Sequence, residues 1–337
     1  MQTDFILRNY GLNENKNLTP YSYENEEDWL ELRRKGIGGS DIGAIMGINK
    51  YSSPLKIYKA KVEGISEDVS GKVAVRKGKD LESLIRANYV APKLKELGYT
   101  VRPFNHLLIN SKFPWLRANL DGIAINDENP EDYQKHIVIE IKVVTEYAED
   151  NWYTGEYDNV PASYYAQVQE YMAVTETKKA LVCALFERKW EMHYFEVRRN
   201  EKFVSELLTT SKRFYDVNMM MGIPPRINLP IDKDEALSMV AKTVDVPTHA
   251  DAELTALAIE VKELKKKIKS LEKDVNDKTS EILDRYQKGG RSNSPLVKVS
   301  VSVISSKKLN TTRLKEEQPG IYEQYSEDSE SLRTNIR

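Results

Sequence analysis

The chain has 337 residues, of which 30% are charged, and its formal net charge is −2. This length holds one large domain or one domain with an appendage, and the charge excludes a uniformly basic protein. Cys183 is the only cysteine, which excludes intramolecular disulfides, a zinc ribbon and a cysteine-ligated iron–sulfur cluster. Because the sequence has neither a signal-peptide pattern nor a long apolar run, we expect a soluble cytoplasmic protein.

Positive charge is nevertheless concentrated in two segments. Residues 32–61 carry seven Lys or Arg against one Asp, a net charge of +6, and residues 71–102 carry eight against three acids, a net charge of +5. Basic surface of this kind suits a phosphate backbone, and such binding weakens as salt rises. Ordinary solvated helix faces carry similar charge, so these segments alone do not decide between the two interpretations.

The predicted elements begin with helices. Residues 1–25 are polar and irregular, and we interpret them as a loose arm. Capping residues and apolar spacing then predict three helices, over 26–35, 53–64 and 72–97, the last with a kink or break at Pro92. Between the first two lies a glycine-rich turn whose Ser40-Asp41 pair opens a short helix. Such a turn presents backbone N–H groups to a phosphate, although a plain helix cap has the same sequence.

The middle of the chain alternates strands and helices. Strands are predicted over 100–110, 116–125 and 137–144, followed by a helix over 161–175, a hairpin of 180–187 with 190–197, and a helix over 200–221. This order predicts an α/β (α+β) fold with a mixed central sheet flanked by helices. Residues 26–222 would form this domain and residues 223–252 a linker.

The C-terminal residues, 253–337, follow a different pattern. Apolar residues recur at alternating spacings of three and four, which is a heptad seam and predicts a helical hairpin or a coiled coil. The seam consists of Leu254, Leu257, Val261, Leu264, Ile268, Leu271, Val275 and Ile282, with an interruption at Lys278. A strand-like segment, 295–305, and a polar tail come after it.

The residues with the clearest chemistry lie in two strand-like segments. Asp121 precedes a short apolar run, and Glu140 and Lys142 lie in the β-branched run 137–144, where alternation places both on one face. Charges on an otherwise buried strand are costly unless they are paired or bind something. Two carboxylates suit Mg²⁺, and the ammonium would orient or deprotonate the water that attacks phosphorus. Such triplets also occur as solvated faces or surface ion pairs.

Two further polar side chains lie on partly apolar helix faces. Glu82 shares a face with Ile85 and Tyr89, and is either a third acid of this site or a surface glutamate. Gln167 lies on the inward stripe of the helix over 161–175. A buried amide there needs hydrogen-bond partners, whether in a core or in a site.

Five segments, taken in order, resemble the YqaJ-like viral recombinase family, which contains the lambda exonuclease and belongs to the restriction-endonuclease-like PD-(D/E)xK nucleases. They are Trp29 to Asp41, Gly78 to Glu82, Leu120 to Gly122, Glu140 to Lys142, and Tyr164 to Gln169. The resemblance covers roughly residues 26–222 and implies a restriction-endonuclease-like core. The C-terminal helical appendage predicted from the heptad seam is absent from the lambda enzyme.

The resemblance also implies ligands for metal ions. Asp121 and Glu140 would ligate Mg²⁺, or Mn²⁺ in its place, together with the backbone carbonyl of Ile141. Glu82 would hold a second ion or a metal-bound water. Two ions per site are therefore expected.

The remaining site residues implied by the resemblance act on water and on phosphate. Lys142 would position the attacking water, supported by Gln167, and Arg34, Ser40 and Tyr164 would bind the 5′-terminal phosphate. At one position the chain departs from some relatives, because Asn119 stands where they have a phosphate-binding serine.

The resemblance implies a metal-dependent 5′→3′ exonuclease that digests one strand of double-stranded DNA from its end to 5′-mononucleotides. It would leave 3′ single-stranded tails for homologous recombination, in the cytoplasm of a bacterial host or phage-infected cell. Family members form rings around DNA, so we expect a homotrimer that passes the exposed strand to a single-strand annealing protein of the RecT or Red-beta type. Two alternatives stay open: an endonuclease or a 3′-directed nuclease on the same fold, and a non-catalytic or weakly catalytic DNA-binding or scaffold protein of a phage recombination system.

Overall fold

The chain forms two compact units, Met1–Lys233 and Asp234–Arg337, which are described separately. The computed structural model describes residues 2–65, 73–229, 231–241, 252–285, 290–293, 298–303 and 305–327. Parts of several predicted segments lie outside the described residues: residue 1 of the arm, residue 72 of the third helix, residues 230 and 242–251 of the linker, and residues 286–289, 294–297, 304 and 328–337 of the C-terminal segment.

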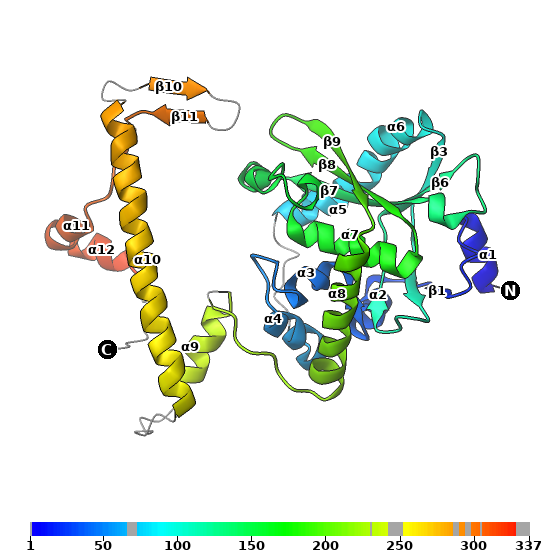
Figure 1. Cartoon of the computed structure of the whole chain (residues 1–337), viewed down its shortest axis with the longest axis horizontal. Helices are drawn as coiled ribbons and strands as arrows, with labels where there is room; N and C mark the ends of the chain where they lie inside the picture. Colours follow the sequence, from blue (N-terminus) through cyan, green and yellow to red (C-terminus); the bar gives the residue numbers. More distant parts are fainter. Residues whose placement is uncertain are drawn as a thin grey trace. The chain divides into compact units, whose positions relative to one another are not determined.

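A five-stranded mixed sheet forms the centre of the first unit (Figure 1). The strands, in spatial order, are β3 (Tyr99–Arg102), β6 (Gly122–Asn126), β7 (Ile137–Val144), β8 (Lys179–Phe186) and β9 (Glu191–Arg198). Within this sheet β7 and β8 are parallel and the other neighbours are antiparallel. Parallel neighbours need a crossover connection, and α7 (Ala162–Thr175) supplies it. The predicted strand over 137–144, the helix over 161–175 and the hairpin are confirmed.

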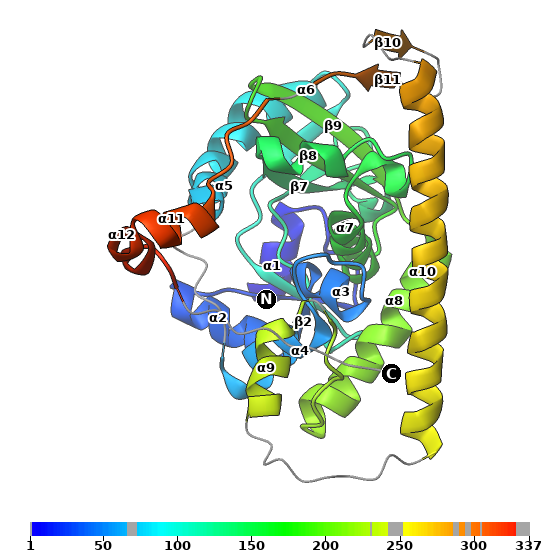
Figure 2. The ribbon, with the colours of Figure 1, turned by 90° about the vertical axis from the view of Figure 1, so that its left-hand side faces the viewer.

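Side chains alternate between the two faces of the sheet along each strand, and helices cover both faces. On one face Val138 and Val182 belong to the same core as α7. On the other face Ile139 and Ile141 belong to a core with residues of α5 (Val73–Ile85) and α6 (Ala91–Lys95). Figure 2 shows the sheet between these two helical layers. The predicted mixed sheet flanked by helices is therefore confirmed.

The predicted helix over 72–97 does not break at Pro92. Instead α5 continues through a π-helical turn, Arg86–Val90, into α6, in which Pro92 is the second residue. Proline has no backbone N–H and its ring crowds the carbonyl of the preceding turn. The wider π turn accommodates both effects without ending the helix.

Two predicted strands are each divided in the structure. Residues 100–110 form β3 and β4 (Leu107–Asn110), and residues 116–125 form β5 (Leu116–Arg117) and β6. β4 and β5 belong to smaller sheets, so the prediction of two continuous strands was wrong. Pro103, directly after β3, has no N–H to donate to a ladder. Residues 118–121 then carry the chain from β5 to the central sheet, and Asp121 lies at the end of this connection.

The N-terminal residues are folded, which corrects the prediction of a loose arm. They form α1 (Gln2–Asn9) and β1 (Leu18–Tyr21), and β1 pairs with β4 in an antiparallel ladder. Leu12 between them is completely buried. Apolar residues spaced through a polar stretch thus give this segment enough buried surface to order it.

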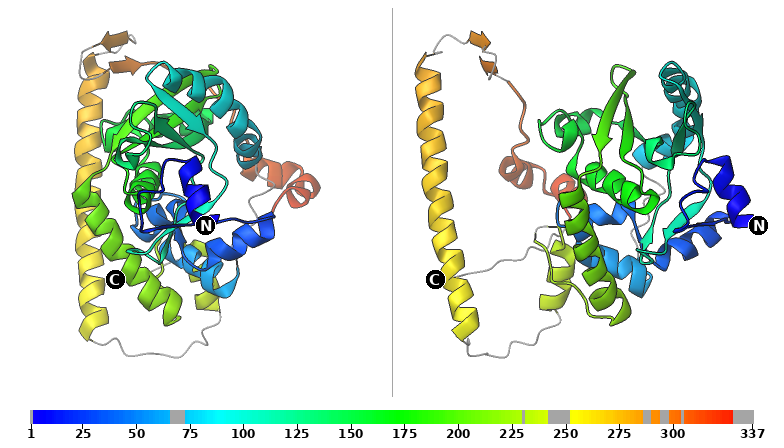
Figure 3. Two further views of the ribbon diagram at one scale, coloured as in Figure 1. Left: turned by 90° about the vertical axis from the view of Figure 1, so that its right-hand side faces the viewer. Right: turned by 45° about the vertical axis from the view of Figure 1, so that its right-hand side comes forward.

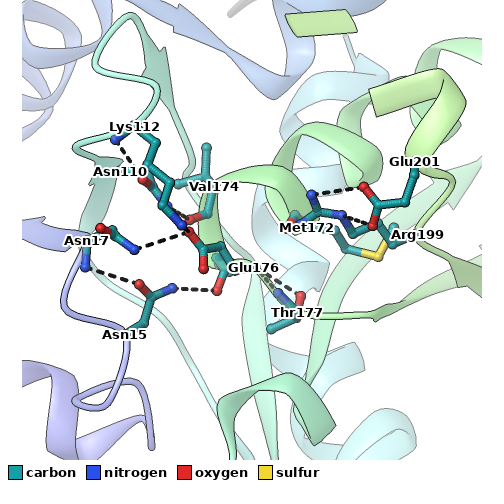
Figure 4. A network of polar contacts seen from close by, with 11 residues as sticks. Asn15, Asn17, Asn110, Lys112, Met172, Val174, Glu176, Thr177, Arg199 and Glu201 are labelled. Atoms are coloured by element: carbon teal, nitrogen blue, oxygen red, sulfur yellow. Dashed lines mark hydrogen bonds and ion pairs between the residues drawn. The ribbon is translucent and has the colours of Figure 1, made fainter. Parts of the chain in front are cut away.

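A polar network ties the N-terminal segment to the end of α7 (Figure 4). Asn15 donates to the backbone oxygen of Thr175 at 3.0 Å. Asn17 and Asn110 donate to the Glu176 carboxylate at 3.3 and 3.2 Å, and Lys112 forms an ion pair with it at 2.7 Å. Glu176 therefore joins three chain segments at one carboxylate.

The other predicted helices of the first unit are confirmed with small changes at their ends. They are α2 (Glu26–Arg34), α4 (Pro54–Tyr58) with a π turn (Lys59–Glu63), and α8 (Glu201–Arg213) with a π turn (Phe214–Met220). The glycine-rich turn forms β2 (Ile37–Gly38) and α3 (Gly39–Ile45). Asn25 and Ser53 cap α2 and α4 by accepting hydrogen bonds from backbone N–H groups.

The second unit is dominated by α10 (Ala252–Arg285), a single helix of 34 residues. Both views in Figure 3 show it as one uninterrupted rod. The unit also contains α9 (Lys233–Ala241), the antiparallel pair β10 (Gly290–Asn293) and β11 (Lys298–Val301), and the short helices α11 (Thr311–Glu317) and α12 (Pro319–Gln324). The long helix is as predicted, whereas a helical hairpin with a second long arm is absent from the described residues. Across the described chain, no helix has the length and apolar content that crossing a membrane requires.

Candidate active site

Asp121 and Glu140 face each other across neighbouring strands. The pairing of Gly122 with Ile139, continued by one residue, places Asp121 opposite Glu140. Asp121 is fixed there because its carboxylate accepts a hydrogen bond from the Ile141 N–H at 2.7 Å. Burial and the neighbouring Glu140 carboxylate raise the pKa of Asp121 well above its usual value. Burial likewise raises the pKa of Glu140, which is 1% exposed, although Lys142 opposes this.

The two oxygens of Glu140 have different surroundings. Its Oε1 atom contacts the Lys142 ammonium and accepts a hydrogen bond from Gln167 at 2.8 Å. Its Oε2 atom is buried without a hydrogen-bond partner. The same Gln167 amide donates to the Tyr171 hydroxyl at 2.8 Å, so α7 holds Glu140 through a short relay. A buried carboxylate oxygen without a partner is rare in folded proteins and therefore needs an explanation.

Lys142 carries its charge on the face of the sheet that packs against α7. Burial favours the neutral amine, but the carboxylates of Glu140 and Asp121 outweigh it and raise the lysine pKa. The ammonium also lies 4.8 Å from the centre of the Tyr164 ring. Lys142 is thus protonated at neutral pH and in contact with both an acid and an aromatic side chain.

Arg86 links Glu82 to the acid pair formed by Asp121 and Glu140. The Arg86 guanidinium bonds to the Glu82 carboxylate at 2.8 Å and to the backbone oxygen of Asp121 at 2.7 Å. The charge of Glu82 contributes to the raised pKa values of Asp121 and Glu140, after larger effects. All three predicted acids are therefore brought together, with Arg86 between the outer acid and the inner pair.

The residues present suit a divalent ion chemically, but the described residues contain no group of three or more His, Cys, Asp or Glu side chains arranged to hold one. Carboxylates and backbone carbonyls are the hard oxygen ligands that Mg²⁺ prefers. The buried, unpartnered Oε2 of Glu140 and the facing Asp121 provide such oxygens. Lys142 and Arg86 neutralise the acids in this arrangement.

The three predicted phosphate-binding residues lie on different helices: Ser40 at the start of α3, Arg34 at the end of α2 and Tyr164 on α7. Gly39 packs so tightly that a Cβ there would stand 2.6 Å from the Tyr171 ring and 3.0 Å from Gln167, which brings Ser40 beside the site face of α7. The Ser40 hydroxyl accepts a hydrogen bond from Arg33 at 2.7 Å. The exposed Arg34 instead lies beside Gly64: a Cβ at that glycine would be 3.9 Å from the Arg34 guanidinium nitrogens.

Two contacts complete this phosphate-binding region. The Arg33 guanidinium stacks on Trp29, 4.7 Å from its ring centre. Trp29 in turn donates to the side-chain oxygen of Asn119 at 3.2 Å. This asparagine, which replaces the serine of some relatives, therefore acts as a partner of Trp29.

Tyr164 lies on the wall of a cleft of about 330 Å³. The cleft is formed by the connection after α3, residues 48–51, and by residues 148–164 ahead of and within α7. Trp152 packs against Tyr164 with ring centres 5.8 Å apart. Tyr164 also contacts Lys142, so this tyrosine touches both the cleft and the lysine beside Glu140.

Sequence reasoning missed three residues that the structure adds to the site. Arg34 was predicted to bind phosphate, but it is Arg33 that contacts Ser40, and the two arginines differ only in the direction in which α2 turns them. Tyr171 lies four residues after Gln167 on the same face of α7, a spacing that the sequence shows. Arg86 stands four residues after Glu82, which is a usual ion-pair spacing.

Comparison with known proteins identifies the family of this part of the chain. Residues 28–178 match the family model of the YqaJ-like viral recombinase domain. A relative over almost the whole length is the uncharacterized protein YqaJ of Bacillus subtilis (strain 168), 23% identical over 328 residues that cover 95% of this chain and 97% of the relative. The predicted resemblance to the YqaJ-like viral recombinase family is therefore confirmed over residues 28–178.

Two solved structures resemble the fold more distantly. An alkaline exonuclease from Laribacter hongkongensis is 20% identical with a TM-score of 0.45, and the match covers 64% of this chain and 97% of that protein. A phage-related exonuclease from Haemophilus somnus 129PT is 14% identical with a TM-score of 0.37, covering 58% of this chain and all of that protein.

Proposed function

We propose that this chain is a metal-dependent exonuclease that digests one strand of double-stranded DNA in the 5′→3′ direction, releasing 5′-mononucleotides and leaving a 3′ single-stranded tail. The observation that carries the proposal is the Glu140 carboxylate. One of its oxygens is held by Lys142 and Gln167, and the other is buried without a partner beside Asp121. Burying such a group is costly, so its retention favours a ligand. The YqaJ-like domain match supports a role in recombination.

The acid pair would hold Mg²⁺, with Mn²⁺ as a substitute. Asp121, Glu140 and the Ile141 carbonyl are the proposed ligands, and Glu82 would serve a second ion or its water after release from Arg86. When bound, such ions lower the pKa of water and neutralise the negative charge that develops on the phosphate.

Lys142 acts in this proposal as a hydrogen-bond donor. Its ammonium contacts Glu140, and from this position it would orient the attacking water. Gln167 fixes the carboxylate to which Lys142 is bonded. Together they set the direction from which water reaches the phosphorus, and small errors in that direction slow a reaction strongly.

The 5′-terminal phosphate would bind at the start of α3. Ser40 supplies a hydroxyl, and Arg33 and Arg34 supply positive charge from consecutive positions of α2. Tyr164 and the adjoining cleft would accommodate the nucleotide next to the scissile bond. We further propose a ring of three chains around the duplex, and delivery of the exposed strand to a single-strand annealing protein.

The site assignment is tested by Glu140→Gln and Lys142→Ala, each assayed for nucleotide release from linear duplex DNA in Mg²⁺. Both substitutions should lower the rate by at least about 100-fold, because each removes a group in direct contact with the proposed reaction. Matched controls are Glu206→Gln and Lys202→Ala, exposed residues of α8, which should retain full activity. Undiminished turnover in either site variant, with an unchanged circular-dichroism spectrum, would remove the assignment.

The polarity is tested with duplexes labelled at the 5′ or the 3′ end, with and without Mg²⁺. Early release of the 5′ label as a mononucleotide, only with the metal, is the expected result. A 5′-hydroxyl end should be digested more slowly than a 5′-phosphate end. Release of the 3′ label first, or internal cleavage of a closed circle, would instead identify a 3′-directed nuclease or an endonuclease on this fold.

A further inference from the structure

The apolar seam of α10 carries different residue types at its two kinds of heptad position. The a positions are Leu254, Val261, Ile268, Val275 and Ile282, four of the five β-branched, and the d positions are Leu257, Leu264 and Leu271, followed by Lys278. Each of these apolar side chains is between 37% and 64% exposed. β-Branched residues at a with leucine at d favour two parallel strands over three or four.

The second unit has no described helix long enough to cover this seam. α10 has 34 residues, about 51 Å at 1.5 Å per residue, whereas α9 has nine, α11 has seven and α12 has six. A second copy of α10 matches the seam in length and in residue pattern.

The charges beside the seam are compatible with a parallel pair. In a parallel, in-register pair each g position faces the next e position of the partner helix. Glu260 would then face Lys265 of the other copy, and Lys267 would face Glu272, so both charged pairs are opposite in sign. An antiparallel pair with full overlap would place Glu260 against Glu281, which is repulsive, but also Lys267 against Asp274 and Lys265 against Glu272, which are attractive. The parallel direction is therefore favoured chiefly by the residue types at the a and d positions.

We propose that α10 forms a parallel, in-register, two-stranded coiled coil with α10 of a second copy of this chain. The single charged d residue, Lys278, bonds within its own helix to Glu281 at 2.7 Å, near the end of the seam. Pairing of α10 joins chains two at a time, whatever ring the first unit forms. It is independent of the nuclease activity proposed above.

A cysteine placed in the seam tests the pairing directly in the full-length protein. Leu271→Cys puts a thiol at a d position, where the same residue of two parallel copies meets. The native Cys183 is completely buried and does not compete. Mild oxidation should convert most of the variant to a crosslinked pair on a non-reducing gel. Lys273→Cys, on the outer f position of the same helix, is the matched control and should stay uncrosslinked.

Charge exchange then tests direction and partner. In the Leu271→Cys background, Lys265→Glu with Glu272→Lys should abolish crosslinking, because like charges would face each other at both pairs. Glu260→Lys with Lys267→Glu should do the same. Mixing the two variants should restore crosslinking, since every facing pair is again opposite in sign. Absence of crosslinking in Leu271→Cys itself, equal crosslinking in Lys273→Cys, or no rescue on mixing would overturn the proposal. Leu271→Cys should not crosslink if the seam packs on its own chain, pairs in the antiparallel direction or binds another protein.

Discussion

Glu170 is a buried acid that the proposed chemistry does not use. It lies on α7 between Gln167 and the end of the helix, is completely buried, and neither carboxylate oxygen has a hydrogen-bond partner. Burial and the nearby Asp41 raise its pKa well above the usual glutamate value, although Arg117 opposes this. The folded chain therefore holds a proton on this side chain more tightly than the unfolded chain does.

This proton makes stability depend on pH in a direction that can be tested. As pH rises above the ordinary glutamate pKa, the unfolded chain releases the proton first, so folding loses stability until the folded carboxyl also ionises. Glu170→Gln has nothing to titrate. We expect its melting temperature to rise relative to the unchanged chain between pH 4 and pH 8. Differential scanning fluorimetry at both pH values measures this, with the exposed Glu206→Gln as control. If the melting temperatures of Glu170→Gln and the unchanged chain differed by the same amount at both pH values, the raised pKa of Glu170 would be contradicted.

The residues of the candidate site differed in how well their positions could be predicted from the sequence. Glu140 and Lys142 were predictable because strand alternation alone places them on one face, away from the isoleucines. Asp121 was recognised from its motif, yet its position at the end of a connection was not foreseen, because the strand was predicted to continue through it. The choice of Arg33 over Arg34 at Ser40 depends on the rotation of α2 against α3, which is set by tertiary packing.

At the scale of elements, the sequence predicted long regular segments well and short ones poorly. β7 and α7 are long and buried along most of their length, and α8 has a clear amphipathic period, so in each the local pattern agrees with the tertiary environment. β4 and β5 have four and two residues, and their partners β1 and β2 lie far away in the sequence. Such pairing depends on contacts between distant segments, which periodicity does not report.

The junction between α7 and the N-terminal segment gives a prediction at this scale. Glu176 has φ of 60°, a left-handed conformation that favours glycine, while its carboxylate binds Asn17, Asn110 and Lys112. Glu176→Ala should lower the free energy of unfolding by about 1–3 kcal/mol, because these bonds are lost and the strain remains. Glu176→Gly should lose less, by up to about 1 kcal/mol, since glycine relieves the strain.

Urea denaturation of the two variants measures the difference. The expected order of midpoints is the unchanged chain first, then the glycine variant, then the alanine variant. If the urea midpoint of Glu176→Ala equalled or exceeded that of Glu176→Gly, backbone strain at this position would not contribute to stability. If alanine equalled the unchanged chain, the network in Figure 4 would carry no stability.

At the scale of the whole molecule, the sequence separated a mixed α/β region from a C-terminal helical one because the apolar period changes between them. The place of the boundary was harder to predict, since proline-rich residues after Gly222 resemble a linker. In the structure the first compact unit runs to Lys233. Ile227 packs against its core, and the completely buried Asp232 accepts a hydrogen bond from Ser53.

Two truncated chains test where the first unit ends. A chain ending at Lys233 should unfold near the temperature of the same unit in the full protein. A chain ending at Gly222 should be less stable by about 2–4 kcal/mol, because Ser53 loses a buried partner and the surface under Ile227 is exposed. Ser53→Ala in the longer chain isolates the hydrogen bond and should account for part of the loss. Calorimetry measures the unfolding transition of each truncated chain. Equal transitions would show that residues 223–233 are a linker and do not stabilise the first unit.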